Sequence, residues 1–398
     1  MPLPPPTPLA GPGQPVTWMF AFKFNAASFP GCSSNGVPPP IGTPGIFGGT
    51  VAAYPNGHSQ QYVFATSASR TLVKGTGCLG ATLSDPLGAT FAQVYNTPGY
   101  FYVVWNDQFY NNPTPTVFAP WGHSKGMLAW SEDGIGFILQ VSTPSWPASG
   151  SKAHPRLNDG NTLGCIEDDD IEVSQHFFAL QLTKADLALV LSALANSSVW
   201  TSAAQPSIVN NGGPPDIQSL VNSLGKLSSS TACTVSTLSS GVQLISKPSS
   251  LQVPPWQMVS AKLGAVPLRV ACWWTDPDPI ASTPAGLVPG CWAPGLGSPG
   301  PVAIATTGDW NGTSIGLQGG ESPDCNHAKI GLSTDPTQTL CIFGDMNQQG
   351  ALSPGAPGSG LTCDLSQNGR GGLFYVVNDP ILYKSLTLLL AGNSAPLG

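Results

Sequence analysis

The chain has 398 residues, of which 41% are hydrophobic and only 9% are charged. This length corresponds to two or three units of ordinary domain size, and the apolar content is sufficient for a core. The net charge of −7 and the isoelectric point near 5.0 argue against a nucleic-acid-binding protein at neutral pH, because phosphate contacts usually come from a surplus of Lys and Arg. Protonation of the five histidines would bring the charge to −2, and protonation of carboxylates at lower pH would make it positive. With DNA as the partner, this composition would favour binding at acid pH.

The 47 glycines and 41 prolines predict short strands joined by long ordered loops, with helix in the minority. Residues 1–13 are predicted to be a disordered Pro-rich lead. The predicted elements of the first half are strands at 18–24, 60–67 and 101–108, a hairpin at 121–143, a strand at 176–183 and a helix at 184–196. Thr183 is the expected N-cap of that helix, which closes the first half at about residue 200.

A Gly/Pro-rich linker at 196–216 leads to the second half, residues 206–398. The predicted elements there are a helix at 217–227 capped by Asp216, strands at 236–246, 267–274 and 302–307, a hairpin at 326–347, a strand at 374–379 and a terminal helix at 381–392. Residues 276–301 are predicted to be a loop. Strands with a few helices between them indicate an α+β or α/β sheet architecture.

Signal peptides and transmembrane helices would indicate the compartment of the protein. The N-terminal MPLPPPTPLAGPG has neither the basic start nor the apolar core of a signal peptide. No run reaches 18 apolar residues, so no transmembrane helix is expected.

The nine cysteines form no CxxC pair and no zinc-like spacing with histidine. Disulfides formed in an oxidising compartment are the favoured interpretation, with one thiol left over, and free buried cysteines are the alternative. Cys341 with Cys363, on either side of a Gly/Pro-rich loop, is the first pairing to expect.

Two copies of the motif His-x-Lys lie about half a chain apart: His123-Ser124-Lys125 and His327-Ala328-Lys329. With five histidines and ten lysines, chance would produce two copies in only roughly one such chain in a hundred. Each copy opens a predicted strand, turn and apolar strand, and residues two apart on a strand face the same side. We therefore interpret the chain as an internal duplication whose two motifs meet at a pseudo-twofold axis.

Several other patterns are discounted. GTGCLG and GLGSPG match GxGxxG, but the first has Pro86 where its helix should begin and the second contains Pro299. GTSIG, residues 312–316, resembles a nucleophile elbow but is predicted to be a turn. The acidic run 167–170 is interpreted as a solvated loop in preference to a calcium site. His58, His154 and His176 have no matching lysine and receive no catalytic role.

The paired motifs resemble the phospholipase D superfamily, whose signature is HxK, four residues, Asp, and then a GSxN segment. Asp345 and Asn347 in GDMN lie at the GSxN position of the second half, and Ser142 lies at the corresponding place in the first. The family aspartates are missing, because Trp130 and Thr334 occupy their positions. The task of fixing the imidazole tautomer must therefore fall to other groups.

This departure, together with several ordered sequence blocks, resembles the acid deoxyribonuclease (DNase II) family. The blocks are GQPVTWMFAFKF, FYVVWNDQ, GHSKG, NHAKIGLS, CIFGDMNQQG and GLTC, from about residue 13 to 384, with 206–320 matching only loosely. The resemblance implies a secreted or lysosomal-type endonuclease that acts on the DNA backbone and leaves 3′-phosphate and 5′-hydroxyl ends. It also implies two mixed sheets flanked by helices, joined as a pseudodimer with one composite site.

The chemistry of the two motifs fits this implication. One imidazole, with His123 favoured, attacks phosphorus to form a phosphohistidine, and the other, His327, protonates the leaving 5′ oxygen. Lys125 and Lys329 hold the phosphate. Asn106, Gln108, Ser142, Asp345 and Asn347 are candidate supporting residues by motif match alone. A metal or other cofactor is not expected.

Two alternatives stay open at this point. One is a phospholipase D-like diesterase acting on lipid head groups, which the missing aspartates and the absence of an amphipathic membrane helix disfavour. The other is a catalytically silent secreted DNA-binding homologue, which does not need two intact HxK motifs. The oligomeric state is open, with a homodimer as one option.

Overall fold

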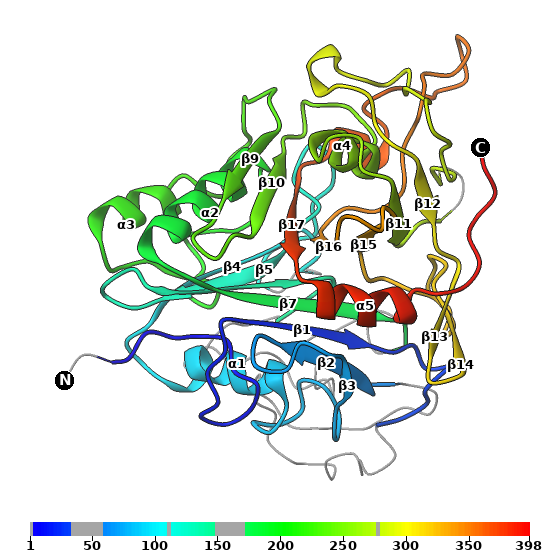
Figure 1. Ribbon diagram of the computed structural model, residues 1–398. Helices are drawn as coiled ribbons and strands as arrows, with labels where there is room; N and C mark the ends of the chain where they lie inside the picture. Colours follow the sequence, from blue (N-terminus) through cyan, green and yellow to red (C-terminus); the bar gives the residue numbers. More distant parts are fainter. Residues whose placement is uncertain (1–2, 33–58, 110–112, 148–171, 276–278) are drawn as a thin grey trace.

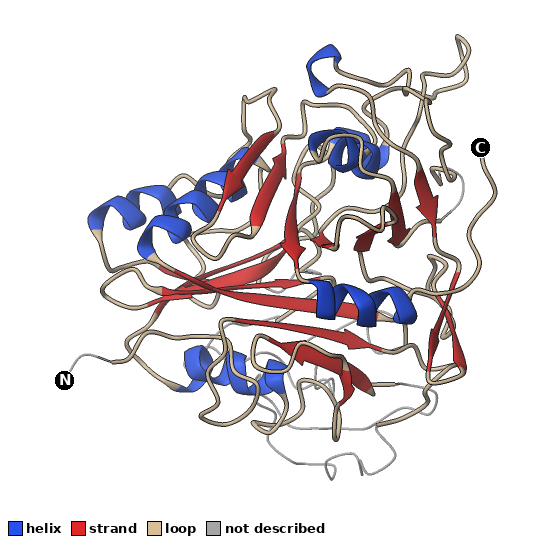
Figure 2. Ribbon diagram, in the orientation of Figure 1, coloured by secondary structure: helices blue, strands red, loops and turns tan. Residues whose placement is uncertain are grey.

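The computed structural model describes the chain except residues 1–2, 33–58, 110–112, 148–171 and 276–278 (Figure 1). Its described part is a mixed α+β structure, as expected. Two large sheets lie one against the other, with helices around them (Figure 2). A small hairpin of β13 (Thr307–Trp310) and β14 (Thr313–Gly316) lies beside them.

The first sheet is antiparallel throughout and has the spatial order β3-β2-β1-β7-β6-β5-β4-β8. Its strands are β1 (Trp18–Lys23), β2 (Tyr62–Thr66), β3 (Val73–Lys74), β4 (Phe101–Asn106), β5 (Lys125–Trp130), β6 (Gly136–Val141), β7 (Gln175–Leu182) and β8 (Val209–Asn210). The central strands β5 and β6 are buried at every residue, which explains why they are apolar runs rather than alternating ones.

The second sheet has the order β12-β11-β15-β16-β17-β10-β9 and is antiparallel except for the β11–β12 pair. Its strands are β9 (Thr234–Thr237), β10 (Gln243–Lys247), β11 (Leu268–Ala271), β12 (Val302–Ile304), β15 (Ile330–Ser333), β16 (Leu340–Gly344) and β17 (Gly372–Asn378). Each large sheet thus contains the strand that follows one HxK motif.

Aromatic side chains join the two sheets. Phe343 of β16 stacks on Phe20 of β1 at a centroid distance of 4.7 Å and on Phe178 of β7 at 4.6 Å. Phe178 also contacts Tyr375 of β17. All four rings are fully or almost fully buried, so β1 and β7 pack directly on β16 and β17. This packing holds the two sheets together.

Five α-helices and two 3₁₀ helices occur in the described part: α1 (Pro86–Asn96), α2 (Lys184–Asn196), α3 (Pro215–Val221), α4 (Pro255–Lys262), α5 (Pro380–Leu389), η1 (Pro294–Leu296) and η2 (Ser366–Gly369). The predicted helix α2 is confirmed, including Thr183 as its N-cap in a capping box with Asp186. The predicted terminal helix is confirmed as α5, where Asp379 caps the backbone N–H groups of Ile381 and Leu382.

One helix was ruled out wrongly, a second was predicted with the wrong cap and end, and a third was not predicted. Pro86 does not prevent a helix after GTGCLG but begins α1 at its first position, where a missing N–H costs nothing, and Asp85 caps it. The helix expected after Asp216 begins at Pro215 and ends at Val221, so Asp216 lies in its first turn and does not cap it. Helix α4, with Pro255 at its start, was not anticipated.

Two smaller predictions also change. GTSIG is not a turn, because four of its residues form β14, while the turn before that strand uses positive φ at Asn311 and Gly312. The N-terminal lead, expected to be disordered, packs along α1 from residue 3 onward. There the Leu9 N–H donates to Thr90 Oγ1 at 2.9 Å, and Gln93 Nε2 donates to the Thr7 carbonyl at 2.7 Å.

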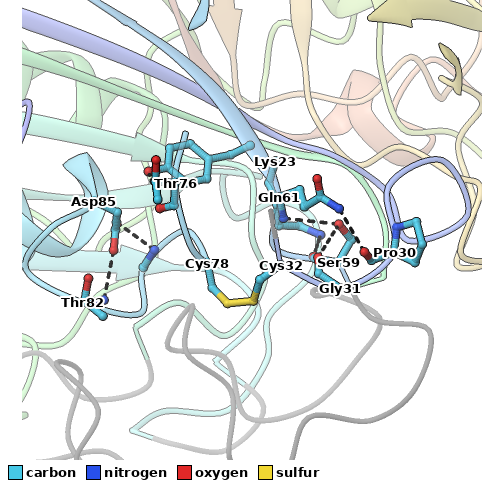
Figure 3. The surroundings of a disulfide bond; sticks show 12 residues. Lys23, Pro30, Gly31, Cys32, Ser59, Gln61, Thr76, Cys78, Thr82 and Asp85 are labelled. Carbon is cyan, nitrogen blue, oxygen red and sulfur yellow. Dashed lines mark hydrogen bonds between the residues drawn. A yellow bond between two sulfur atoms is a disulfide. The ribbon is translucent and has the colours of Figure 1, made fainter. Parts of the chain in front are cut away.

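The expected Cys341–Cys363 disulfide is wrong. Cys363 pairs with Cys291, with Cα atoms 5.2 Å apart, whereas Cys341 is buried in β16 between the sheets, where a loop cysteine cannot reach it. A second disulfide, Cys32–Cys78, ties the segment after β1 to the loop after β3 (Figure 3). Free cysteines in the described part are Cys233, Cys272, Cys325 and Cys341, and Cys165 lies outside it.

Candidate active site

Each HxK histidine is held by the opposite sheet. The His123 backbone N–H donates to the Gly371 carbonyl at 2.8 Å, immediately before β17 of the second sheet. The His327 N–H donates to the Ser174 carbonyl at 2.7 Å, immediately before β7 of the first. Both histidines lie just ahead of their strands, β5 and β15, rather than on them. The backbone at the junction of the two sheets therefore sets both positions.

The imidazole rings make the same reciprocal contact. His123 Nδ1 lies 2.8 Å from the carbonyl oxygen of Asp345, and His327 Nδ1 lies 2.9 Å from that of Ser142. A carbonyl can only accept a hydrogen bond, so each Nδ1 carries the proton. In the neutral ring, Nε2 is then left with its lone pair. These two carbonyls therefore perform the tautomer-fixing task for which the sequence lacked its aspartates.

One pocket of about 340 Å³ is lined by both His123 and His327. Its other lining residues come from the loops around the junction: Gln108, Val117, Phe118, Ala119, Trp273, Asn347, Gln349, Ser366, Gln367 and Arg370. The two histidines are 6% exposed or less, so they are reached through this pocket rather than from open surface. The volume falls in the range of small-ligand sites.

Lys125 belongs to a buried ionic cluster. Its ammonium lies 2.7 Å from one carboxylate oxygen of Asp107, and Arg370 Nη2 lies 2.8 Å from the other. Burial alone would raise the pKa of Asp107, but the charges of Lys125 and Arg370 hold this pKa below its usual value. Asp107 is fully buried and stays ionised, so it neutralises one of two neighbouring cations. The cluster keeps a net positive charge beside His123.

Lys329 is held differently. Its ammonium donates to the carbonyl of His327 at 2.5 Å and contacts no carboxylate among the described residues. His327 Nδ1 is also 3.3 Å from this ammonium, but that nitrogen already donates to Ser142 and cannot accept as well. Burial, followed by the charge of Lys125, lowers the pKa of Lys329 to about 7. Lys329 therefore gains and loses its charge near neutrality.

The same burial acts on the histidines. It lowers the pKa of both His123 and His327 well below 6.5, and the nearby lysines lower it further. The charge of Arg370 adds to this effect at His123. Both rings are therefore neutral at neutral pH, and protonation of either one requires acid solution and is favoured by a neighbouring anion.

Asp345 and Ser142, two predicted supporting residues, also contribute their side chains. The Asp345 carboxylate accepts from Gln140 Nε2 at 2.9 Å and from the Leu373 N–H at 3.0 Å, and burial raises its pKa to about 6. Ser142 Oγ accepts from the His176 N–H at 2.8 Å and donates to Gln175 at 2.5 Å. These contacts fix the two carbonyls that hold the imidazoles.

Of the three amide side chains predicted to support the site, two line the pocket and one does not. Asn106 is the last residue of β4, where its side chain donates to the Trp146 carbonyl and accepts from the Gln108 N–H. Gln108 and Asn347 line the pocket, and their side-chain oxygens have no partner among the described residues. Asn106 therefore shapes the loop, whereas Gln108 and Asn347 are placed to meet a ligand.

Sequence reasoning missed Asp107 and Arg370. Asp107 stands between two residues that were named, and its position directly after a buried strand was the only signal available. Arg370 lies 263 residues from Asp107 in the sequence, so no local pattern indicated their contact. His176 is buried, accepts from the Lys329 N–H and lies outside the pocket lining, while His58, His154 and the acidic run 167–170 lie outside the described residues.

Among the residues that the structure describes, no three His, Cys, Asp or Glu side chains gather in an arrangement that would hold a metal ion. In the same part of the chain, no helix is both long and apolar enough to span a bilayer.

The model of the deoxyribonuclease II family matches residues 51–282, more than half of the chain. The match includes the first HxK motif and ends before the second. No curated protein sequence matches the chain. The chain therefore belongs to the deoxyribonuclease II family and is a deoxyribonuclease, a hydrolase whose substrate is DNA.

Proposed function

We propose that the chain is a metal-independent acid endonuclease and that His123, Lys125, His327 and Lys329 form its single composite active site. The two halves, residues 14–200 and 206–398, would be phospholipase D-like units related as a pseudodimer. The observation that carries the proposal is the reciprocal bonding of the two imidazoles, each to a carbonyl of the other sheet. This bonding leaves both Nε2 atoms free at one pocket.

In the first step, neutral His123 attacks phosphorus through Nε2 while protonated His327 donates its Nε2 proton to the departing 5′ oxygen. The new N–P bond gives a phosphohistidine, and the broken P–O bond releases a 5′-hydroxyl end. The charge of Arg370 lowers the pKa of His123, which supports the assignment of His123 as the nucleophile. Lys125 and Lys329 offset the charge on the phosphoryl oxygens.

In the second step, neutral His327 takes a proton from water, and the resulting hydroxide attacks phosphorus. The N–P bond breaks, His123 recovers its lone pair, and the product is a 3′-phosphate end. Because burial keeps His327 neutral in the free protein, its protonation needs both acid solution and the negative phosphate. This requirement supports activity at acid pH. The two disulfides are consistent with a secreted or lysosomal protein.

Plasmid digestion at about pH 5 in excess EDTA, with end-group analysis of the products, tests the proposal. We expect cleavage that leaves 3′-phosphate and 5′-hydroxyl ends. The variant His327→Asn places a side-chain amide where Nδ1 donates to the Ser142 carbonyl but has no Nε2, so it should fold and fail to cleave. No cleavage by the wild type in EDTA, or equal cleavage by His327→Asn, would refute the proposal.

A further inference from the structure

Arg370 lines the pocket that holds both histidines, but the chemical steps above give it no contact with DNA. Its guanidinium is always charged and carries N–H donors on Nε and on both terminal nitrogens. The side chain is only 9% exposed, so few of its atoms are accessible. The hydrogen bonds of each nitrogen show which donors remain for a ligand.

The protein itself uses the donors of Nε and Nη2. Nε donates to the Trp121 carbonyl at 2.9 Å. Nη2 donates to the Asp107 carboxylate at 2.8 Å and to the Gly122 carbonyl at 3.2 Å. All three acceptors lie in the segment between β4 and β5. These contacts hold one side of the planar guanidinium in a fixed orientation beside His123.

The remaining nitrogen, Nη1 of Arg370, makes no hydrogen bond within the described part of the chain. Buried donors in proteins are nearly always satisfied, so an unused one at a pocket indicates a missing acceptor. Nη1 is also not sealed inside the protein, because it does not belong to the buried polar atoms that lack a partner. Both of its N–H groups are therefore reached from the pocket that Arg370 lines.

Arg370 also differs from the two HxK lysines in its access to the pocket. Neither Lys125 nor Lys329 is among the described residues that line the pocket, and Arg370 is the only Lys or Arg there. The Lys125 ammonium lies 2.7 Å from the Asp107 carboxylate, and burial lowers the pKa of Lys329 to about 7. Arg370 thus brings to the pocket a positive charge that pH does not remove.

A buried lysine of the second sheet fixes the backbone of Arg370. Lys247 is the last residue of β10 and is fully buried. Its ammonium donates to the carbonyls of Asn368 and Arg370, each at 2.8 Å. The next residue, Gly371, carries the carbonyl that accepts the His123 N–H. Lys247 therefore holds the short segment that places both Arg370 and His123.

We propose that Arg370 is a catalytic residue that donates from Nη1 to a non-bridging oxygen of the scissile phosphate, and that Lys247 is the positioning residue that holds it there. A donor that is fixed before the substrate binds stabilises charge on the phosphoryl oxygens without reorganisation in the reaction. The influence of Arg370 on the pKa of His123 agrees with a place on the side of the attacking ring. This inference rests on the proposed function, because it uses the same pocket and the same phosphate.

Arg370→Met tests the catalytic assignment. The variant leaves Asp107 paired with Lys125, so the buried cluster becomes neutral and the protein should fold. The value of kcat on DNA should fall by about 10²- to 10³-fold, the usual cost of one lost donor to a transition state.

The stereochemistry of cleavage gives a sharper readout. An end-labelled duplex carries one phosphorothioate, in which sulfur, a weak acceptor, replaces one non-bridging oxygen in either the Rp or the Sp form. Wild type should cleave the two diastereomers at this position at different rates, and Arg370→Met should bring the two rates closer together. Their ratio does not depend on how much of the protein is folded, so it separates a lost contact from structural damage.

Lys247→Met tests the positioning role. It should lower cleavage by about 10- to 100-fold, as expected for a displaced catalytic group, and should move the diastereomer ratio in the same direction as Arg370→Met. Lys23, the last residue of β1, is the matched control, because it is equally buried and its ammonium donates to the carbonyls of Phe24 and Ser59, which do not line the pocket. Lys23→Met should leave the ratio unchanged.

An unchanged ratio in Arg370→Met would overturn the catalytic assignment. An unchanged ratio in Lys247→Met, or an equal change in Lys23→Met, would overturn the positioning role. Binding of a labelled duplex to His327→Asn, with and without Arg370→Met, tests the phosphate contact apart from cleavage. Loss of the contact should lower the slope of log Kd against log salt by about 1, and an equal slope would contradict it. Failure of the proposed reaction is seen separately, as cleavage by His327→Asn at the wild-type rate.

Discussion

The two HxK motifs hold their histidines alike and their lysines differently. Both imidazoles donate from Nδ1 to a carbonyl of the opposite sheet, at 2.8 and 2.9 Å. Lys125, however, is paired with the buried carboxylate of Asp107, whereas the Lys329 ammonium donates to a carbonyl oxygen and meets no carboxylate in the described part of the chain. The two sheets thus hold the two imidazoles in the same way, by one carbonyl each. They place the two lysines in different electrostatic surroundings, one beside a carboxylate and the other beside a carbonyl. The predictions below test that difference, from the largest expected effect to the smallest.

Removal of either imidazole should have the largest effect. His123→Asn and His327→Asn keep a donor to the carbonyl but lose Nε2, and each should lower kcat on DNA by about 10⁴-fold or more. Because the two rings act in one reaction, the double variant should be little worse than either single variant. The measurement is steady-state cleavage, with urea unfolding to show that the variants fold. Multiplicative losses in the double variant would contradict a shared site.

Asp107→Asn should affect stability strongly and has no counterpart in the second motif. The substitution leaves Lys125 and Arg370 adjacent and unneutralised in a buried setting, which should cost about 3 kcal/mol of unfolding free energy. Activity should fall as well, because Lys125 loses the carboxylate that holds its ammonium. Asp216→Asn, which removes an exposed ion pair with Lys184, is the matched control and should change neither property. Equal urea midpoints for the two variants would contradict the described role of Asp107.

Replacement of each lysine by methionine should affect activity alike but stability differently. Both variants should lose activity by about 100-fold, since each removes a charge from the phosphate site. Lys125→Met should also lose stability, because Asp107 keeps only Arg370, whereas Lys329→Met should not, because the Lys329 ammonium is itself disfavoured by burial. Lys184→Met, half-exposed, serves as the control. Equal losses of stability at both sites would remove the contrast between the motifs.

The pH dependence of the Lys329→Met stability follows from the same pKa. The folded pKa of about 7 lies below the unfolded value of 10.5, so the unfolded state binds more protons between these limits. Below pH 7 the wild-type protein should therefore carry the full free-energy cost of burying the charged Lys329 ammonium. Its stability should rise as the pH rises toward 10.5. The advantage of Lys329→Met over wild type should shrink over that window in urea titrations. An advantage that grew with pH would show that the assigned direction is wrong.

Activity should rise as the pH falls below 6.5. Burial and then the nearby lysines lower the pKa of His327, so the protonated acid accumulates only in acid solution. The pH profile of kcat/KM reports ionisations of the free enzyme. In this profile, the fall in activity that follows loss of the His327 proton should have its midpoint below pH 6.5. Lys329→Met removes a cation beside His327 and should move this midpoint toward neutral pH, although the rate is lower. A wild-type midpoint at or above 6.5 would contradict the described burial.

The smallest effect should come from His176, which is buried outside the pocket lining. Burial lowers its pKa to about 3, so the unfolded state alone takes up this proton as the pH falls from 6.5. His176 should therefore make the protein less stable with falling pH, by up to about 1.4 kcal/mol per pH unit. His176→Asn, which keeps an acceptor for the Lys329 N–H, should reduce this slope in unfolding measurements between pH 6 and 4. An unchanged slope would show that His176 is not held neutral.

Local signals were sufficient for the strands of the two hairpins and for the residues of the motifs. The apolar runs after each HxK motif predicted β5, β6, β15 and β16, and Thr183 marked the start of α2 because a side-chain cap is a local interaction. The two motifs were found for the same reason. Proline is common both at the first position of a helix and at positions that break one, so its presence alone does not say which applies. For this reason Pro86 was taken to exclude a helix that it begins, and the helix that begins at Pro255 was not predicted.

The supporting groups could not be found because they act across the chain. Asp345 and Ser142 were named from motif matches, yet they hold the imidazoles through backbone carbonyls, which any residue provides. Arg370 reaches Asp107 from 263 residues away, and the Cys291–Cys363 pairing depends on loop packing. The lowered pKa of the histidines likewise depends on burial, which the order of residues does not record.

The central claim is that His123 and His327 divide one reaction between them. Thymidine 3′-(4-nitrophenyl phosphate) tests it most directly, because nitrophenolate departs without a proton donor and leaves the later hydrolysis dependent on the general base. We predict that His327→Asn releases one nitrophenolate per molecule in a burst and then stalls as a phosphohistidine at His123, which is detected after an alkaline quench because its N–P bond is acid-labile and base-stable. His123→Asn should release none. Steady turnover near the wild-type rate by either variant would contradict the account.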